Sequence, residues 1–168
     1  MSKRSLETAA LRYLQRFPCS TDHLRQVLRR RVQRAEVPPP EDAWPRWIDE
    51  VIATMTEAGL LNDAAYARAL AASLHRKGRP LRSIAAKLRE KRVPVPLVRE
   101  CLEGMQEDVP DADVDAAWVF AAKKRLGPYS RSPEERRARR PRDLAAFARA
   151  GFSFSVARIV VDAPTPRE

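Results

Sequence analysis

The stretch Gly59-Leu60-Leu61-Asn62-Asp63-Ala64-Ala65-Tyr66-Ala67 predicts a junction between two helices. Gly59 can adopt the left-handed backbone conformation that closes a preceding helix. Asn62 is a favoured N-cap, and the carboxylate of Asp63 suits the positive end of the next helix. Leu61 and Tyr66 then stand at N′ and N4, where apolar side chains pack together and set the angle between helices. We therefore expect one helix to end before Gly59 and another to begin after Asn62.

Helical spacing of apolar residues recurs on both sides of this junction, and alternating strand periodicity is absent. Apolar stripes cover residues 6–14, 24–32, 44–55, 66–74, 81–88, 97–105, 116–121, 144–148 and 156–160. Pro141 predicts a break or kink in the eighth of these helices. Three sections of three helices each indicate an all-α fold with an internal repeat of about 50 residues.

The section boundaries follow from prolines, glycines and an acidic segment. We expect a first three-helix unit at residues 1–58, with a Pro-rich insertion near residues 37–45. A basic second unit follows at residues 59–108, and the acidic residues between 103 and 115 mark its end. The third unit is expected at residues 109–162, and residues 163–168 form a flexible tail.

The composition indicates a basic protein of the reduced cytoplasm. The 168 residues carry 32 Lys and Arg against 22 Asp and Glu, a net charge of +10, which favours a polyanionic partner. A solvated basic surface that arises from genomic base composition is the alternative, but such a bias does not concentrate charge in a few segments. Cys19 and Cys101 lack C-x-x-C spacing, and neither a signal peptide nor a membrane-spanning run is present.

Motifs of known enzyme classes are absent from the sequence. It lacks Gly-rich phosphate loops, the H-E-x-x-H zinc motif and the G-x-S-x-G nucleophile motif. His23 and His75 lack partners at ligand spacing, which argues against a metal site. We therefore expect a protein that is not an enzyme, with no catalytic residues, cofactor or metal.

Three clusters of basic residues remain, each at or near the middle helix of its section. They lie at residues 29–34, 76–92 and 131–142. Such clusters contact phosphates without reading bases, so the expected binding is non-specific and salt-dependent. The alternative is that each cluster interacts with carbonyl groups at helix C-termini and otherwise points to water. The residues that we expect to bind nucleic acid or its protein complex are Arg29, Arg30, Arg76, Lys77, Arg79, Arg82, Lys87, Lys91 and Arg149.

A sequence-specific helix-turn-helix transcriptional regulator is the alternative function. Residues 83–98 have the small residue and apolar second helix of that motif. However, Arg89 occupies the turn where glycine is usual, and the second helix offers few base-reading side chains beyond Arg99 and Glu100.

Three segments resemble the RecX family of bacterial regulators of the RecA recombinase. The opening junction resembles the family signature G-L-L-[DN]-D-x-x-[FY]-A, and residues 76–84 with Leu88 and Lys91 resemble R-K-G-x-G-x-x-x-I…L…K-G-V. Residues 143–153 resemble the C-terminal L-x-x-F-L-x-R-x-G-F-S. The sequence departs from the family at Arg79 and Arg92, where glycine is usual, and at residues 38–47, which form an insertion.

The resemblance implies an elongated array of three tandem three-helix units that works without a cofactor. It also implies binding in the groove of the filament that RecA forms on single-stranded DNA, usually with inhibition of filament growth and activity. The implied roles are in DNA repair, recombination and the SOS response. We accordingly expect two partners, the RecA filament and, weakly and without sequence preference, single-stranded DNA. The protein itself is expected to be a monomer.

Overall fold

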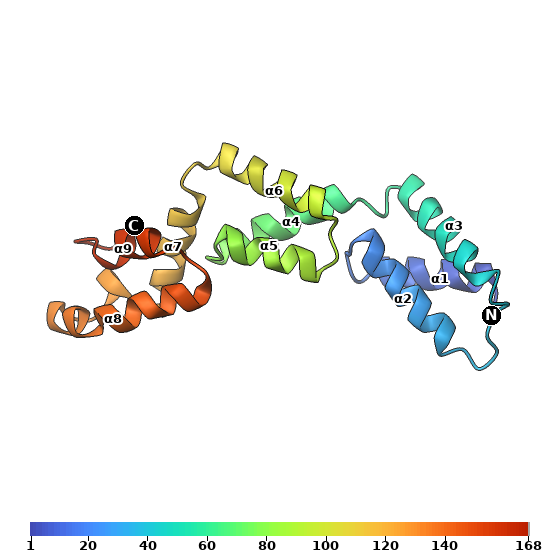
Figure 1. The fold of residues 1–168 in the computed structure, drawn as a ribbon, viewed down its shortest axis with the longest axis horizontal. Coiled ribbons are helices and arrows are strands. Elements are labelled where there is room, and N and C mark those ends of the chain that lie inside the picture. The colour runs from blue at the N-terminus through green and yellow to red at the C-terminus, as the bar shows by residue number, and fades with distance from the viewer. Residues whose placement is uncertain (168) are drawn as a thin grey trace. The chain divides into compact units, whose positions relative to one another are not determined.

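The computed structural model describes residues 1–167, and within that range it contains nine α-helices, one short 3₁₀-helix and no strand (Figure 1). Glu168, the end of the predicted flexible tail, lies outside the described residues. The helices follow one another as α1 (Lys3–Leu14), α2 (Thr21–Gln33), α3 (Trp44–Glu57), α4 (Asp63–Arg76), α5 (Leu81–Glu90), α6 (Val95–Asp108), α7 (Ala112–Lys124), α8 (Pro133–Ala150) and α9 (Phe154–Val161). The predicted all-α fold of tandem three-helix repeats is confirmed.

The chain folds into two compact units. Unit 1 contains residues 1–68 and 89–97, and unit 2 contains residues 69–88 and those from Val98 onward. Helices α4, α5 and α6 each contribute residues to both units. The boundaries predicted at residues 58, 108 and 162 stay a prediction.

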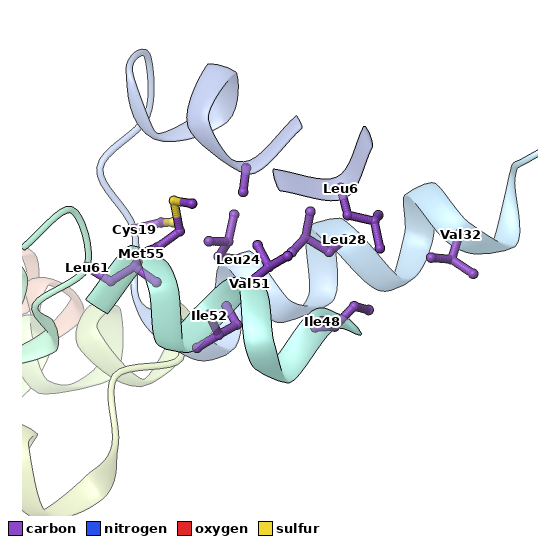
Figure 2. Close-up of a cluster of buried hydrophobic side chains, with 11 residues drawn as sticks. Leu6, Cys19, Leu24, Leu28, Val32, Ile48, Val51, Ile52, Met55 and Leu61 are labelled. Carbon is purple, nitrogen blue, oxygen red and sulfur yellow. The ribbon is translucent and has the colours of Figure 1, made fainter. Parts of the chain in front are cut away.

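Helices α1, α2 and α3 enclose the core of unit 1. Figure 2 shows apolar side chains of α2 and α3, among them Leu24 and Val51, converging beneath α1. Leu6, Leu24, Leu28 and Val51 are fully buried. The tryptophans of α3, Trp44 and Trp47, pack against this core rather than standing free on the surface. Each such buried aliphatic side chain contributes about 1.5–3 kcal/mol relative to an exposed one.

Helices α7, α8 and α9 enclose the core of unit 2 around three phenylalanines. Ring centroids of Phe120, Phe147 and Phe152 lie 5.1–5.5 Å apart. Alanines of α7 let α8 and α9 approach closely, because Ala116, Ala117 and Ala121 are almost fully buried. A 3₁₀-helix (Gly127–Tyr129), which the apolar periodicity does not reveal, connects α7 to the segment before α8.

The junction at residues 59–67 is built as predicted. Gly59 has φ +71°, and the amide of Leu60 donates to the carbonyl of Met55 at 2.9 Å, which closes α3. The side chain of Asn62 caps α4 by accepting from the amide of Ala65 at 2.9 Å.

Asp63 has a role that the sequence did not indicate. Its carboxylate accepts from the backbone amide of Thr21 at 2.7 Å and from the Thr21 hydroxyl at 3.0 Å, so it caps the start of α2. In unit 2, Asp113 of α7 accepts from the amide of Leu81, the first residue of α5, at 2.7 Å. A carboxylate in the first turn of a later helix thus caps the basic middle helix that precedes it.

Of the break or kink predicted at Pro141, the break is wrong, because α8 runs without interruption from Pro133 to Ala150, and the kink stays a prediction. Pro141 has no backbone N–H, so the carbonyl of Arg137 loses its helical hydrogen bond. Both residues lie on the exposed side of the helix, where water can satisfy that carbonyl. The helix also has strong ends, with the Ser132 hydroxyl accepting from Glu135 at its start and Gly151 at φ +98° closing it.

Candidate nucleic-acid interface

The turn between α4 and α5 carries four exposed basic side chains of unit 2. Helix α4 ends at Arg76 and is closed by Gly78, whose φ is +81°, with the amide of Arg79 donating to the carbonyl of Leu74 at 3.2 Å. This closure turns the chain sharply and places Arg76, Lys77, Arg79 and Arg82 on both sides of one tight bend. All four side chains are exposed, and none forms an ion pair with a described residue.

Helix α7 holds the backbone of this turn. A Cβ added at Gly78 would lie 2.9 Å from the amide nitrogen of Phe120, so only glycine allows the turn to approach α7 this closely. The Nζ of Lys123 donates to the carbonyl of Lys77 at 3.0 Å. His75 contacts the carbonyl of Ala112 at 2.7 Å. The backbone is therefore fixed on several sides while the cationic side chains stay in solvent.

The C-terminal end of α8 lies beside the same turn. A Cβ added at Gly151 would lie 3.6 Å from Pro80, which places the end of α8 against the start of α5. Arg149, two residues earlier, is exposed and lines a hollow of about 430 Å³. The other cationic residues of that hollow are Lys124, Arg139 and Arg142. The end of α8 that carries Arg149 therefore lies close to the start of α5.

Asp143 introduces one negative group into this hollow. It is 1% exposed, and its Oδ2 accepts from the amide of Gly127 at 2.8 Å. Its Oδ1 lies 3.9 Å from the Nε of Arg139, too far for a hydrogen bond. Arg139 in turn donates to Glu135, one turn earlier in α8, at 3.0 Å, so its charge is partly neutralised within the helix.

Several arginines of α8 are structural. Arg136 donates to the carbonyls of Val161, Ala163 and Pro164, which lie at and beyond the end of α9. Arg140 forms two hydrogen bonds with Asp162 at 2.7 and 2.8 Å, and this contact holds the pKa of Asp162 below its ordinary value. This part of the third basic cluster therefore interacts with the C-terminal end of a helix, as the alternative interpretation of the clusters predicted.

The nine predicted site residues divide between the two units. Arg76, Lys77, Arg79, Arg82, Lys87 and Arg149 belong to unit 2, and Arg29, Arg30 and Lys91 belong to unit 1. Arg29 and Arg30 are exposed on α2, whereas Lys87 and Lys91 are half-buried. The carbonyl of Lys91 accepts from the Ser20 hydroxyl at 2.7 Å, so part of this residue supports the start of α2.

Lys123 and Lys124 are basic residues near the interface that sequence reasoning missed. They stand in the last turn of α7, where lysines ordinarily complement the helix dipole, so their pattern gives no functional signal. Only the contact between Lys123 and the α4–α5 turn reveals their position.

Among residues 1–167, no group of three or more His, Cys, Asp or Glu side chains lies close enough to hold a metal ion. Burial raises the pKa of Cys19 to about 11, which keeps this thiol protonated and unreactive at neutral pH. None of the described helices is both long and apolar enough to cross a membrane.

Comparison with known proteins identifies one family. The model of the RecX second three-helix domain matches residues 62–102. The regulatory protein RecX of Myxococcus xanthus (strain DK1622) is 43% identical over 164 residues, which cover 96% of this chain and 87% of that protein. The regulatory protein RecX of Thermobifida fusca (strain YX) is 31% identical over 170 residues, which cover 94% and 83%.

Solved structures agree at the level of the fold. The crystal structure of RecX from Lactobacillus salivarius superimposes with a TM-score of 0.69 at 18% identity, covering 95% of this chain and 94% of that one. A second crystal structure, of a regulatory protein RecX, gives a TM-score of 0.67 at 19% identity and covers 96% of this chain and 72% of that one.

Proposed function

This chain belongs to the RecX family, and we propose that it is a non-enzymatic regulator that binds the filament formed by RecA on single-stranded DNA. Binding modulates the filament in the inhibitory direction, slowing its assembly and its recombinase and ATPase activities. The proposed place of action is the cytoplasm, in the regulation of DNA repair and recombination.

The basic turn between α4 and α5 is the observation that carries this proposal. Four exposed cations on a backbone anchored to α7 form a positive surface. Such a surface attracts phosphates from any sequence, since arginine and lysine at this spacing contact the nucleic-acid backbone. A filament offers DNA phosphates together with a protein surface, so the two contacts strengthen each other.

The helix-turn-helix alternative gains no support from α6, the helix that would enter the DNA groove. Its exposed side chains include one arginine, Arg99, against four carboxylates. These acidic residues are Glu100, Glu103, Glu107 and Asp108. Arg99 lies 3.9 Å from Glu103 and is thereby partly neutralised. An acidic helix is repelled by DNA, so we do not favour sequence-specific repression.

A charge-removal variant tests which surface is responsible. We expect glutamine at all four positions of the turn to weaken binding to the RecA filament at least tenfold. On bare single-stranded DNA we expect a weaker salt dependence. The magnitude of the slope of log binding constant against log salt concentration (the salt slope) should fall by about 2.8, at about 0.7 for each lost phosphate contact. The four substitutions are Arg76→Gln, Lys77→Gln, Arg79→Gln and Arg82→Gln.

The matched control removes the same charge from exposed positions elsewhere on the chain. Its substitutions are Arg4→Gln, Arg46→Gln, Arg68→Gln and Arg125→Gln. Fluorescence anisotropy at several salt concentrations should give this control nearly wild-type affinity. Equal losses in the two variants would mean that net charge, and not the α4–α5 turn, governs binding.

A further inference from the structure

Two adjoining hollows lie between α1 and α2 in unit 1. The first, of about 530 Å³, is lined by Arg12, Tyr13, Arg16, Phe17 and Arg31 among others. The second, of about 500 Å³, is lined by Arg30, Arg31 and Arg34. Both hollows share Val27 and Arg31, so together they form one groove, which we call the α1–α2 groove.

The charge of this groove is positive and uncompensated. Its two hollows contain five arginines and no carboxylate. None of these arginines forms an ion pair with a described residue. By contrast, Arg25 pairs with Asp49 at 2.8 Å and Arg92 pairs with Asp22 at 3.1 Å elsewhere in unit 1. The five arginines of the groove line two adjoining hollows without a carboxylate, so the groove favours an anionic occupant.

An exposed aromatic ring stands at one end of the groove. Phe17 is 52% exposed although its backbone is fixed by a 2.9 Å hydrogen bond from its amide to the carbonyl of Tyr13. Its ring centroid lies 5.3 Å from that of Tyr13 and 5.7 Å from the guanidinium carbon of Arg16. An exposed aromatic ring beside arginines is an arrangement on which unpaired bases stack.

We propose that the α1–α2 groove is a second binding site, specific for single-stranded nucleic acid, in which a base stacks on Phe17. Phosphates on either side of that base contact Arg12, Arg16 and Arg31. Duplex DNA is excluded from the stacking contact because its bases are paired and stacked on each other. The choice of nucleic acid as the ligand rests on the proposed function. The inference adds to that function a site in unit 1 that distinguishes single-stranded from double-stranded nucleic acid.

An acidic peptide is the competing occupant, since it also satisfies arginines. A peptide carboxylate has no flat face to place on Phe17, whereas every nucleotide brings a base and a phosphate together. The groove therefore fits a nucleic acid better, and an acidic polymer serves as an arm of the test.

The test compares Phe17→Leu with wild-type protein by fluorescence anisotropy on labelled oligo-dT of about ten nucleotides. Leucine keeps apolar contacts and removes the stacking face, so affinity should fall about fivefold or more. The salt slope should stay the same, because no phosphate contact is lost. On an abasic strand of equal length, the variant and the wild-type protein should bind equally.

Phe154→Leu is the matched control. Phe154 is 65% exposed and lies 6.0 Å from the guanidinium carbon of Arg158, but it belongs to α9 of unit 2. This variant should bind oligo-dT within about twofold of wild type. A double variant, Arg16→Gln with Arg31→Gln, should lower the salt slope by about 1.4, at about 0.7 per phosphate. If Phe17→Leu lowers the melting temperature, this double variant tests the groove in its place.

Wild-type affinity of Phe17→Leu for oligo-dT would overturn the inference, as would an equal loss on the abasic strand. If poly-glutamate displaces oligo-dT from the wild-type protein but not from Phe17→Leu, the groove binds an acidic peptide instead. The proposed function is measured separately on the RecA filament. A chain that inhibits RecA while Phe17→Leu binds oligo-dT normally would refute only the inference about the α1–α2 groove.

Discussion

Arg125 ends α7 in the left-handed conformation, with φ +54° and ψ +51°. The amide of Leu126 donates to the carbonyl of Ala121 at 3.0 Å, which is the same closure that Gly59 and Gly78 provide elsewhere. A residue with a Cβ is strained there by about 1 kcal/mol or more. Arg125 is exposed and forms no ion pair with a described residue, so substitution by glycine can relieve this backbone strain without loss of a side-chain contact.

Arg125→Gly should raise the free energy of unfolding by about 1 kcal/mol and the melting temperature by about 2–4 °C. Arg92→Gly is the matched comparison, because Arg92 has φ +61° but also pairs with Asp22. Loss of that pair should offset part of the gain. Thermal unfolding followed by circular dichroism measures both, and a lower melting temperature for Arg125→Gly would contradict the strain.

His23 makes the stability of unit 1 depend on pH. Burial, followed by the positive charges of Lys91, Arg30 and Arg92, lowers the pKa of this imidazole below 6.5. Between the lowered folded pKa and 6.5, the unfolded chain binds a proton that the folded chain does not, so stability falls as pH falls through this window. Neutral His23 also shares a 2.9 Å hydrogen bond with the hydroxyl of Tyr13.

Chemical denaturation at pH 7 and pH 5 should therefore show lower stability at pH 5. His23→Gln keeps a hydrogen-bond acceptor for Tyr13 and cannot titrate, so its stability should change less over the same range. Parallel pH dependences of the variant and the wild-type protein would mean that other groups account for the effect.

Local signals allowed some residues to be predicted and left others hidden. Gly59 and Asn62 were predictable because a helix end and an N-cap each require particular backbone or side-chain chemistry. Arg92 and Arg125 were not, since an arginine carries no sign of a left-handed conformation. Exposed Arg76 and Arg79 could be found from charge alone, whereas the position of Lys123 depends on packing between α4 and α7.

At the scale of elements, two equivalent capping contacts support the repeat. Thr21 and Asp63 are 42 residues apart, and Leu81 and Asp113 are 32 residues apart. The difference of ten residues equals the length of the insertion at residues 38–47. Each contact caps the first turn of a basic middle helix with a carboxylate from the next section, so the repeat is encoded in polar contacts as well as in apolar stripes.

Asp113→Ala should destabilise the chain by about 1–2 kcal/mol, because it leaves the half-buried amide of Leu81 without its acceptor. Asp111→Ala is the control, since Asp111 is exposed and its side chain makes no capping bond to α7. Urea denaturation should separate the two variants. Equal stabilities would mean that the Asp113 contact does not hold α5.

Elements were predictable where apolar spacing decides them, and less so where polar contacts do. Helices α1 to α7 follow their stripes, and Ser132 with Pro133 correctly indicated the start of α8. The break at Pro141 did not occur because strong ends and an exposed position outweigh one lost hydrogen bond. Arg136 and Arg140 looked like binding residues but stabilise the end of α9, which charge patterning cannot distinguish.

At the scale of the whole molecule, the fold and the family are established, and the mechanism is a proposal. The elongated shape and the three-unit boundaries remain predictions from the sequence and the family resemblance. We propose that a basic surface lets this chain act on a DNA-loaded filament, so a test of its function must include both RecA and DNA.

The most direct measurement is ATP hydrolysis by the cognate RecA on single-stranded DNA, at increasing concentrations of the wild-type protein. We expect hydrolysis to fall as the protein is added, and the four-glutamine variant of the α4–α5 turn to inhibit at least tenfold less well. An unchanged rate of hydrolysis at every concentration, together with selection of one defined sequence from random duplexes, would rule out a filament regulator and identify a sequence-specific one.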